Sequence, residues 1–117
     1  MIIVTVMYDP EDSNEFDMGY YKNTHMPLVR DRLGSFGLQK YEVAKGISDA
    51  NPAEPPLYNI ITQLYFDNVD NVHEGFKQHG REVLGDISNF TSVKPKFQIS
   101  EVEDLWLMDG YVHTHSH

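Results

Sequence analysis

The first run of the chain, Ile2 to Tyr8, carries apolar side chains in both of its alternating sets. One set is Ile2, Val4, Val6 and Tyr8, and the other is Ile3, Thr5 and Met7. Successive side chains of a strand point to opposite faces, so a strand that is largely apolar on both sides needs cover on both faces. This run therefore predicts a central strand and restricts the chain to folds in which layers lie on both sides of a sheet.

A helix is predicted after this strand. Asp17 is a suitable N-cap residue, and Phe16 just before it can pack against Tyr21 as a hydrophobic staple. The apolar positions that follow at helical spacing are Met18, Tyr21, Leu28, Val29 and Leu33. His25 falls on the same face, and Gly34 is predicted to end the helix in the left-handed conformation.

The remaining pattern alternates between strand and helix periods. The predicted elements are a half-exposed strand over 38–47, a loop over 48–56, a strand over 58–66, a helix that starts near Asp67 and Asn68, and a last strand over 93–102. The second helix buries Val69, Val72, Phe76, Val83 and Ile87. Pro95 suits an edge position in the last strand, because proline cannot donate to a ladder.

The predicted order is βαββαβ, an α+β ferredoxin-like domain with a four-stranded antiparallel sheet. Both helices then cover one face of the sheet, and the opposite face keeps several large side chains without cover. We expect a homodimer through this open face. The domain is predicted to occupy residues 1–104, followed by an extension over 105–117 in which 105–108 pack on the domain or on a partner and 113–117 are mobile.

The charge of the chain argues against two classes of partner. Nine Lys and Arg residues face eighteen Asp and Glu residues, giving a formal net charge of −9. Binding to nucleic acid or to an anionic membrane requires basic residues, so neither partner is expected. No run reaches the roughly 20 apolar residues that span a bilayer, and no signal-peptide pattern precedes Ile2, so we expect a cytoplasmic protein.

No metal or nucleotide cofactor is expected from the motifs. The sequence has no cysteine, which excludes thiolate nucleophiles, disulfides and cysteine-based metal centres. His73 and His79 are spaced so that they face different sides of their helix, and we interpret His113, His115 and His117 as part of a solvent-exposed tail. No glycine-rich phosphate loop or dinucleotide fingerprint is present.

His25 is the candidate catalytic residue. A free imidazole titrates near pH 6.5, which suits general acid/base work at neutral pH. Periodicity alone favours a core histidine that is satisfied by a carbonyl or a tyrosine. Pro27 supports the functional reading, because inside a helix it leaves the carbonyl of Asn23 without its donor; alternatively, Pro27 begins a separate helical segment.

Aromatic side chains could line a pocket around this histidine, and tyrosine hydroxyls could donate to a substrate oxygen. The candidate substrate-binding residues are Tyr21, Tyr41, Tyr58, Phe66 and Phe76, each of which is also consistent with an ordinary core position. Tyr21 lies one helical turn from His25. Asn23, Gln63 and Asp86 are polar groups that could orient His25 or a ligand, and we interpret Asp86 as a helix-end or turn residue.

Two segments resemble a known family. The run from Phe16 to Val29, with Thr24-His25-Met26-Pro27 at its centre, is similar to the signature of the EthD family, named for a component of bacterial ethyl tert-butyl ether degradation. The stretch from Gly85 to Ser100 resembles the family's second helix end and last strand, except that Ser88 stands where proline is expected. The resemblance covers residues 1 to about 103, and it favours a functional role for His25 over that of a core histidine.

This resemblance implies a dimeric α/β barrel with a cavity between sheet and helices, and relatives that include isomerases, cyclases and cofactor-free monooxygenases. One hypothesis is a small cofactor-independent enzyme, an isomerase, cyclase or oxidoreductase, that acts on a hydrophobic oxygen-bearing metabolite with His25 as general acid/base. The alternative is a non-catalytic accessory protein that binds such a metabolite for an ether- or ring-degrading oxygenase. A purely structural dimerisation domain would instead have a filled interior beside His25.

Overall fold

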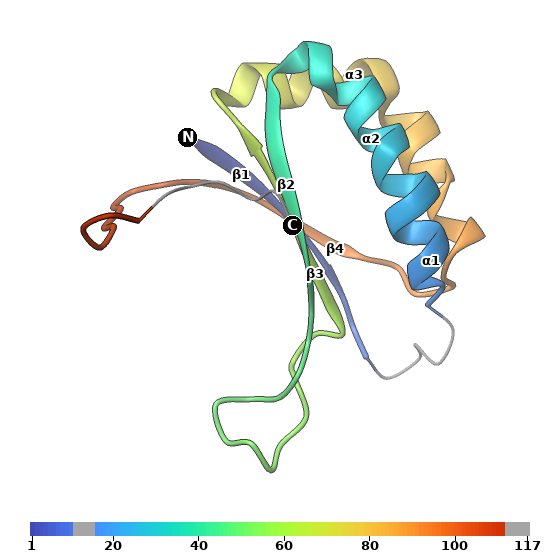
Figure 1. The fold of residues 1–117 in the computed structure, drawn as a ribbon. Coiled ribbons are helices and arrows are strands. Elements are labelled where there is room, and N and C mark those ends of the chain that lie inside the picture. Colours follow the sequence, from blue (N-terminus) through green and yellow to red (C-terminus); the bar gives the residue numbers. More distant parts are fainter. Residues whose placement is uncertain (11–15, 112–117) are drawn as a thin grey trace.

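The computed structural model describes residues 1–10 and 16–111. Its elements are the strand β1 (Ile2–Tyr8), the helix α1 (Met18–Tyr20), a π-helical turn (Tyr21–His25), the helix α2 (Met26–Leu33), the strands β2 (Leu38–Lys45) and β3 (Ile60–Phe66), the helix α3 (Val69–Gly85) and the strand β4 (Lys96–Glu101). The order is βαββαβ, as predicted (Figure 1). No helix among the described residues is long and apolar enough to cross a membrane.

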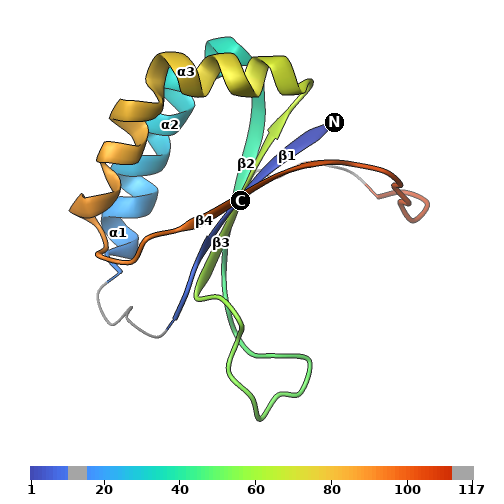
Figure 2. The same ribbon diagram turned by 180° about the vertical axis from the view of Figure 1, so that it is seen from behind.

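The four strands form one antiparallel sheet in the order β2-β3-β1-β4. Both long helices lie on the same side of this sheet, and no helix formed by residues 1–10 or 16–111 lies on the other side (Figures 1 and 2). This arrangement confirms the predicted ferredoxin-like fold. β4 is an edge strand, so Pro95 directly before it removes no ladder bond from the centre of the sheet.

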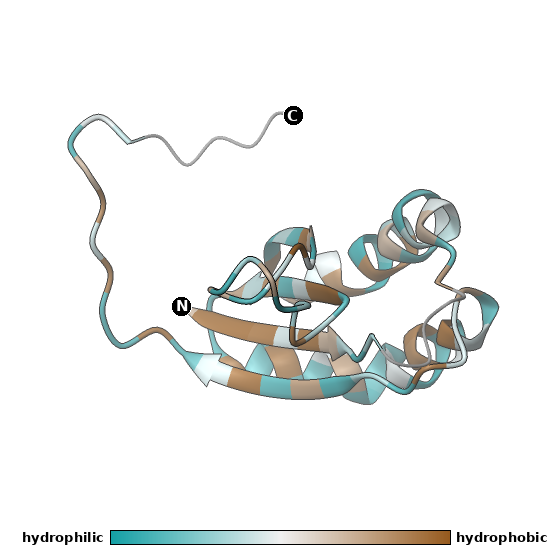
Figure 3. Cartoon of the chain, turned by 90° about the horizontal axis from the view of Figure 1, so that it is seen from below, coloured by the Kyte–Doolittle hydropathy of each residue, from teal (hydrophilic) through white to brown (hydrophobic). Residues whose placement is uncertain are grey.

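The core lies between the sheet and the helices. Ile2, Val4, Val6 and Tyr8 of β1 are buried there, together with Ile60, Leu64 and Phe66 of β3. The second set of β1, which includes Ile3 and Met7, is only half-buried, because it faces the side that has no helix. The apolar character of both sets is visible along β1 in Figure 3. Within the described part of one chain, therefore, helices cover only one face of β1, although the sequence predicts cover on both faces.

The helical segment begins as the sequence predicts. The Asp17 carboxylate accepts a hydrogen bond of 3.0 Å from the backbone N–H of Tyr20, and the rings of Phe16 and Tyr21 meet with centroids 5.1 Å apart. Its end differs from the prediction. Gly34 has right-handed backbone angles, and a short 3₁₀ turn carries the chain on to Gly37, which adopts the left-handed conformation with φ at 91°.

Glycine is required at Gly37 and useful at Gly75. A Cβ atom at Gly37 would lie 2.8 Å from Oδ1 of Asp67, in addition to the strain of a positive φ. A Cβ atom at Gly75 would lie 3.1 Å from the Leu33 side chain and 3.2 Å from that of Phe36. Gly75 weakens α3 as an isolated helix, but it allows α3 to approach α2 closely.

The last three strands are shorter than predicted. β2 ends at Lys45, β3 begins at Ile60 and β4 begins at Lys96. After β4 the described chain leaves the domain as an extended segment up to Met108, and a turn at Asp109 and Gly110 leads to Tyr111 (Figure 3). The predicted mobility of 113–117 lies outside the described residues.

Candidate functional site

The segment that presents His25 is a π-helical turn, Tyr21–His25, between α1 and α2. The backbone N–H of Met26 bonds to the carbonyl of Tyr21, five residues earlier. Pro27 explains this geometry, because it has no N–H with which to continue the normal pattern to Asn23. Both readings of Pro27 are thus partly correct: it lies in the first turn of α2, and the helical backbone nevertheless continues through the π turn. Such turns occur frequently at functional sites.

His25 is buried and paired with a carboxylate. Only 5% of the residue is exposed, and its Nδ1 atom lies 2.9 Å from Oδ2 of Asp86. Asp86 is the C-cap residue of α3, so the pair joins the first helical segment to the end of the second. The interpretation of Asp86 as a helix-end residue is confirmed, and the structure adds its role as the partner of His25.

Two further donors hold Asp86. Its Oδ1 atom accepts hydrogen bonds from the Tyr20 hydroxyl at 2.7 Å and from the Asn89 amide at 2.9 Å. Burial by itself raises the pKa of Asp86, but the hydrogen bonds from His25, Asn89 and Tyr20 outweigh it and lower the pKa below its ordinary value. The position of Asp86 at the C-terminal end of α3 does not lower its pKa, since carboxylates are disfavoured at helix C-termini. Asp86 is therefore ionised at neutral pH because of these side-chain contacts.

Aromatic rings enclose the imidazole. The Tyr21 ring is stacked on the His25 ring with centroids 5.4 Å apart and planes 12° apart. Phe90, which follows the short 3₁₀ turn after Asp86, approaches the His25 ring to 4.7 Å. The backbone carbonyl of Phe90 also accepts the N–H of the N-cap residue Asp17 at 2.8 Å. This bond links the start of the helical segment that carries His25 to the chain that follows Asp86.

A cluster of hydroxyl groups lies on the sheet side of the imidazole. The hydroxyls of Tyr21 and Thr62 are 2.5 Å apart, and Tyr21 also shares a hydrogen bond with Tyr8. Burial raises the pKa of Tyr21 to about 12, while the bonds with Thr62 and Tyr8 act in the opposite direction. Burial and the neighbouring Tyr21 raise the pKa of Tyr8 as well. Both phenols keep their protons at neutral pH and are hydrogen-bond donors.

A small cavity of about 30 Å³ adjoins these groups. Its lining comprises Val6, Tyr8, Tyr21, His25, Met26, Val29, Thr62, Leu64, Phe76, Val83, Leu84, Ile87 and Phe97. The volume exceeds the roughly 10–15 Å³ that a cavity needs to hold one water molecule. The interior beside His25 therefore contains a void with room for water.

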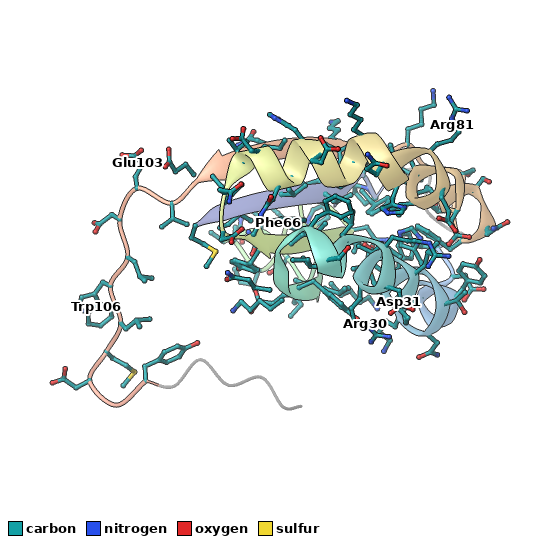
Figure 4. The ribbon with its side chains drawn as sticks, turned by 90° about the horizontal axis from the view of Figure 1, so that it is seen from above. Arg30, Asp31, Phe66, Arg81, Glu103 and Trp106 are labelled. Carbon is teal, nitrogen blue, oxygen red and sulfur yellow. The ribbon has the colours of Figure 1, made fainter. Side chains whose placement is uncertain are left out.

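The structure brings together some of the predicted site residues and not others. His25, Tyr21 and Phe76 line the cavity. Phe66 is fully buried at the opposite end of β3 and belongs to the core (Figure 4). Tyr41 packs against that core from β2, and the Tyr58 ring lies before β3 with Nζ of Lys96 5.5 Å from its centroid. Tyr41, Tyr58 and Phe66 do not line the cavity.

The sequence did not identify Tyr8, Thr62 and Phe90 as residues of the site, and Asp86 was interpreted mainly as a helix-end residue. One signal was available for Asp86: an acid at the C-terminal end of a helix is electrostatically disfavoured, which points to a tertiary partner. Among residues 1–10 and 16–111, no group of three or more His, Cys, Asp or Glu side chains is placed to hold a metal ion. His113, His115 and His117 lie outside the described residues.

Comparison with known proteins identifies the family. The model of the EthD domain matches residues 9–94. The chain belongs to the EthD family. An EthD-like protein from Ralstonia eutropha JMP134, with a solved structure, is 38% identical with a TM-score of 0.79, over 88% of this chain and 94% of that one. A search of curated proteins finds no significant match.

More distant solved structures share the fold. An EthD family protein from Bacillus halodurans C-125 is 20% identical with a TM-score of 0.62, over 87% of this chain and 98% of that one. A dimeric ferredoxin-like protein from an uncultured marine organism is 11% identical with a TM-score of 0.64, over 92% of this chain and 100% of that one. These two likenesses support the α+β ferredoxin-like architecture.

Proposed function

We propose that this EthD family protein is a small enzyme that acts on a hydrophobic, oxygen-bearing metabolite without a metal or nucleotide cofactor, with His25 as general acid/base. The observation that carries the proposal is the buried pair of His25 and Asp86, 2.9 Å apart and enclosed by aromatic rings. A buried titratable pair beside a cavity is a candidate site for proton transfer.

The pair defines which nitrogen does the chemistry. Because Asp86 is ionised, it accepts the Nδ1 proton of neutral His25, and this leaves Nε2 as the basic nitrogen. When Nε2 takes a proton from the substrate, the Asp86 carboxylate stabilises the imidazolium that forms. Returning that proton to another atom of the same molecule completes an isomerisation in which no electrons are lost or gained.

The surroundings of the cavity support the substrate class. The hydroxyls of Tyr8, Tyr21 and Thr62 are suited to hold a carbonyl or phenolic oxygen near His25. Next to the cavity, an apolar groove of about 210 Å³ runs between α3 and β4, and Phe76, Leu84 and Phe97 line both spaces. The oxygen-bearing end of a lactone, enol or phenol would lie at the cavity, and its hydrocarbon part would lie in the groove.

We also propose that the chain forms a homodimer through the open face of the sheet. This face presents Ile3, Met7, Ile61 and Tyr65, all half-buried although no helix covers them. Covering such a face by a second copy removes apolar surface from water, and a two-fold axis places the same patch on both chains. The ferredoxin-like protein from the uncultured marine organism is itself described as dimeric.

The enzyme proposal is tested by proton exchange. Wild-type protein is incubated in D₂O with a panel of unsaturated lactones, enolisable aromatic ketones and phenols, and NMR follows deuterium incorporation and isomerisation. We expect turnover of at least one compound class, and we expect His25→Gln to reduce it by about 10²–10⁴-fold, the usual contribution of a general acid/base. His79→Gln, in which the changed residue packs against Phe36 away from the cavity, is the matched control.

Binding measurements separate the two functional hypotheses. Isothermal titration with the same compounds is expected to show that His25→Gln still binds the compound that wild type converts. If wild type binds a compound but neither exchanges nor converts it, the protein is a non-catalytic binder. Equal turnover by wild type and His25→Gln would contradict the role of His25 directly.

A further inference from the structure

The segment Val102–Tyr111, which we call the C-terminal arm, is extended up to Met108 and then turns at Asp109 and Gly110, and its apolar side chains are largely exposed. Leu105 is 68% exposed, Trp106 81% and Met108 60%, and Leu107 and Tyr111 are also exposed. In an extended chain Leu105 and Leu107 point to one side, whereas Trp106 and Met108 point to the other. The centre of the arm therefore has no polar side, and contiguous apolar surface of this kind marks an interaction site.

The centre of the arm lies away from its own domain (Figure 4). Its first residue still belongs to the sheet, because the N–H of Val102 donates to the carbonyl of Met1 at 3.0 Å. Beyond this bond the arm leaves on the side of the sheet opposite to α2 and α3 (Figures 1 and 2). Figure 4 shows Trp106 well away from the helices and from Phe66 in the core.

The arm and the open face of the sheet enclose one hollow of about 700 Å³. Ile3 and Tyr65 line it from the sheet, and Leu105 and Tyr111 line it from the arm. The hollow is far larger than the cavity beside His25, and it is bordered by the face that we propose as the dimer interface. Any molecule that binds to the open face at this end of the sheet therefore also contacts the arm.

We infer that the C-terminal arm clasps the second copy of the chain, so that each chain of the dimer holds the other. This inference rests on the proposed dimer and adds a separate contact to it. The seven extended residues Val102–Met108 reach about 23 Å at roughly 3.3 Å each, close to the 25 Å least dimension of the molecule. Two-fold symmetry gives two arms and doubles the apolar surface that association removes from water.

The charge of the arm bears on the identity of its partner. Glu103, Asp104 and Asp109 make the arm acidic, and two copies with a formal charge of −9 each repel one another. Contact between copies must then come from apolar burial, and salt should strengthen it by screening the repulsion. A basic protein partner would show the opposite dependence on salt, because salt would screen an attraction.

Trp106 makes the inference measurable in the intact protein, since it is the only tryptophan of the chain. We expect its fluorescence to shift to shorter wavelength over the protein concentrations at which sedimentation shows dimer formation, and added salt to lower the dimer Kd. Trp106→Ala should raise the dimer Kd by about tenfold or more, as aromatic anchors at interfaces do. Val69→Ser, which removes an exposed apolar side chain on the helical side, is the control and should change the Kd less than about twofold.

Each other outcome overturns a different statement. A dimer in which Trp106 keeps the emission of a water-exposed indole contradicts the arm contact and leaves the dimer proposal intact. A monomer at all concentrations contradicts both. A monomer with blue-shifted Trp106 emission shows that the arm packs on its own domain, and weakening of self-association by salt contradicts the apolar origin of the contact.

Discussion

The two faces of the sheet contain similar groups in different settings. On the helix-covered side, the Tyr20 hydroxyl donates to Asp86, which in turn bonds to His25. On the open side, the Tyr65 hydroxyl donates to Glu42 at 3.0 Å, and Nζ of Lys40 lies 3.6 Å from Glu42 and 4.6 Å from the centroid of the Tyr65 ring. Each face thus has a tyrosine, a carboxylate and a basic side chain in contact.

The two groups differ in the basic side chain that accompanies the tyrosine and the carboxylate. Burial and Glu42 raise the pKa of Tyr65 to about 12, so this phenol keeps its proton at neutral pH. The covered group contains an imidazole next to a cavity. The comparison teaches that a tyrosine–carboxylate contact does not by itself indicate a reactive site, and that the function we propose for the covered group rests on its buried histidine.

The largest effect should come from changing neighbouring residues that point to the two faces. Phe66→Ala removes a fully buried ring and should lower the free energy of unfolding by about 3–5 kcal/mol. Tyr65→Ala removes a half-buried ring with two side-chain hydrogen bonds and should cost the single chain about 1–2 kcal/mol. Urea unfolding at low and high protein concentration is the measurement.

The concentration dependence distinguishes the two faces further. The loss of stability caused by Tyr65→Ala should grow at concentrations at which the dimer forms. The loss caused by Phe66→Ala should be the same at those concentrations as in the single chain. If Tyr65→Ala is as costly as Phe66→Ala in the monomer, the open face is not an independent surface.

A smaller effect is expected from Asp86→Asn and should depend on pH. Because the pKa of Asp86 is lowered in the folded state, its carboxylate stabilises the fold above the ordinary value of about 3.9, and this contribution is lost as pH falls below that value. Asp86→Asn should cost about 1–2 kcal/mol at neutral pH. The difference between wild type and variant, measured by urea unfolding, should shrink progressively as the pH falls from about 5 towards 1, because a carboxylate with a lowered pKa protonates only in acid. Parallel profiles would contradict the ionised state of Asp86.

The smallest effect is expected from Tyr20→Phe, which removes one of the three donors to Asp86. Loss of this single hydrogen bond should lower the free energy of unfolding less than Asp86→Asn does. The pKa of Asp86 should rise, and the chemical shift of its carboxyl carbon in a pH titration measures it directly. A larger rise for Tyr20→Phe than for Asn89→Ala would contradict the order in which these two donors lower the pKa of Asp86.

The sequence predicted the fold well because local signals agreed with one another. The alternation of β1, the N-cap at Asp17 and the apolar stripe of α3 each specify an element without reference to distant residues. The exit from α2 was predicted wrongly at Gly34, because Gly37 serves equally well as a left-handed residue and only its contacts with Asp67 and Asn71 distinguish the two.

The candidate site was predictable only on the helix that carries it. Helical spacing placed His25 and Tyr21 on the buried face, but Asp86 is 61 residues away from His25 in the chain. Periodicity indicates the face on which a strand residue lies and says little about which neighbour it meets across the sheet. This is why Phe66 and Tyr41 were placed with Tyr21 as candidates, while Tyr8 and Thr62 were overlooked.

The π-helical turn of Tyr21–His25 acts as a one-residue phase shift within an otherwise continuous helix. Each residue of an α-helix turns the chain by about 100°, so the extra residue rotates everything before it relative to α2 by that angle. The core fixes α2 through Met26, Val29 and Leu33. The shift therefore lets Tyr20 meet Asp86 from α1 while His25 meets the same carboxylate one turn later, and deleting one residue from the turn would uncouple the two contacts without removing either side chain.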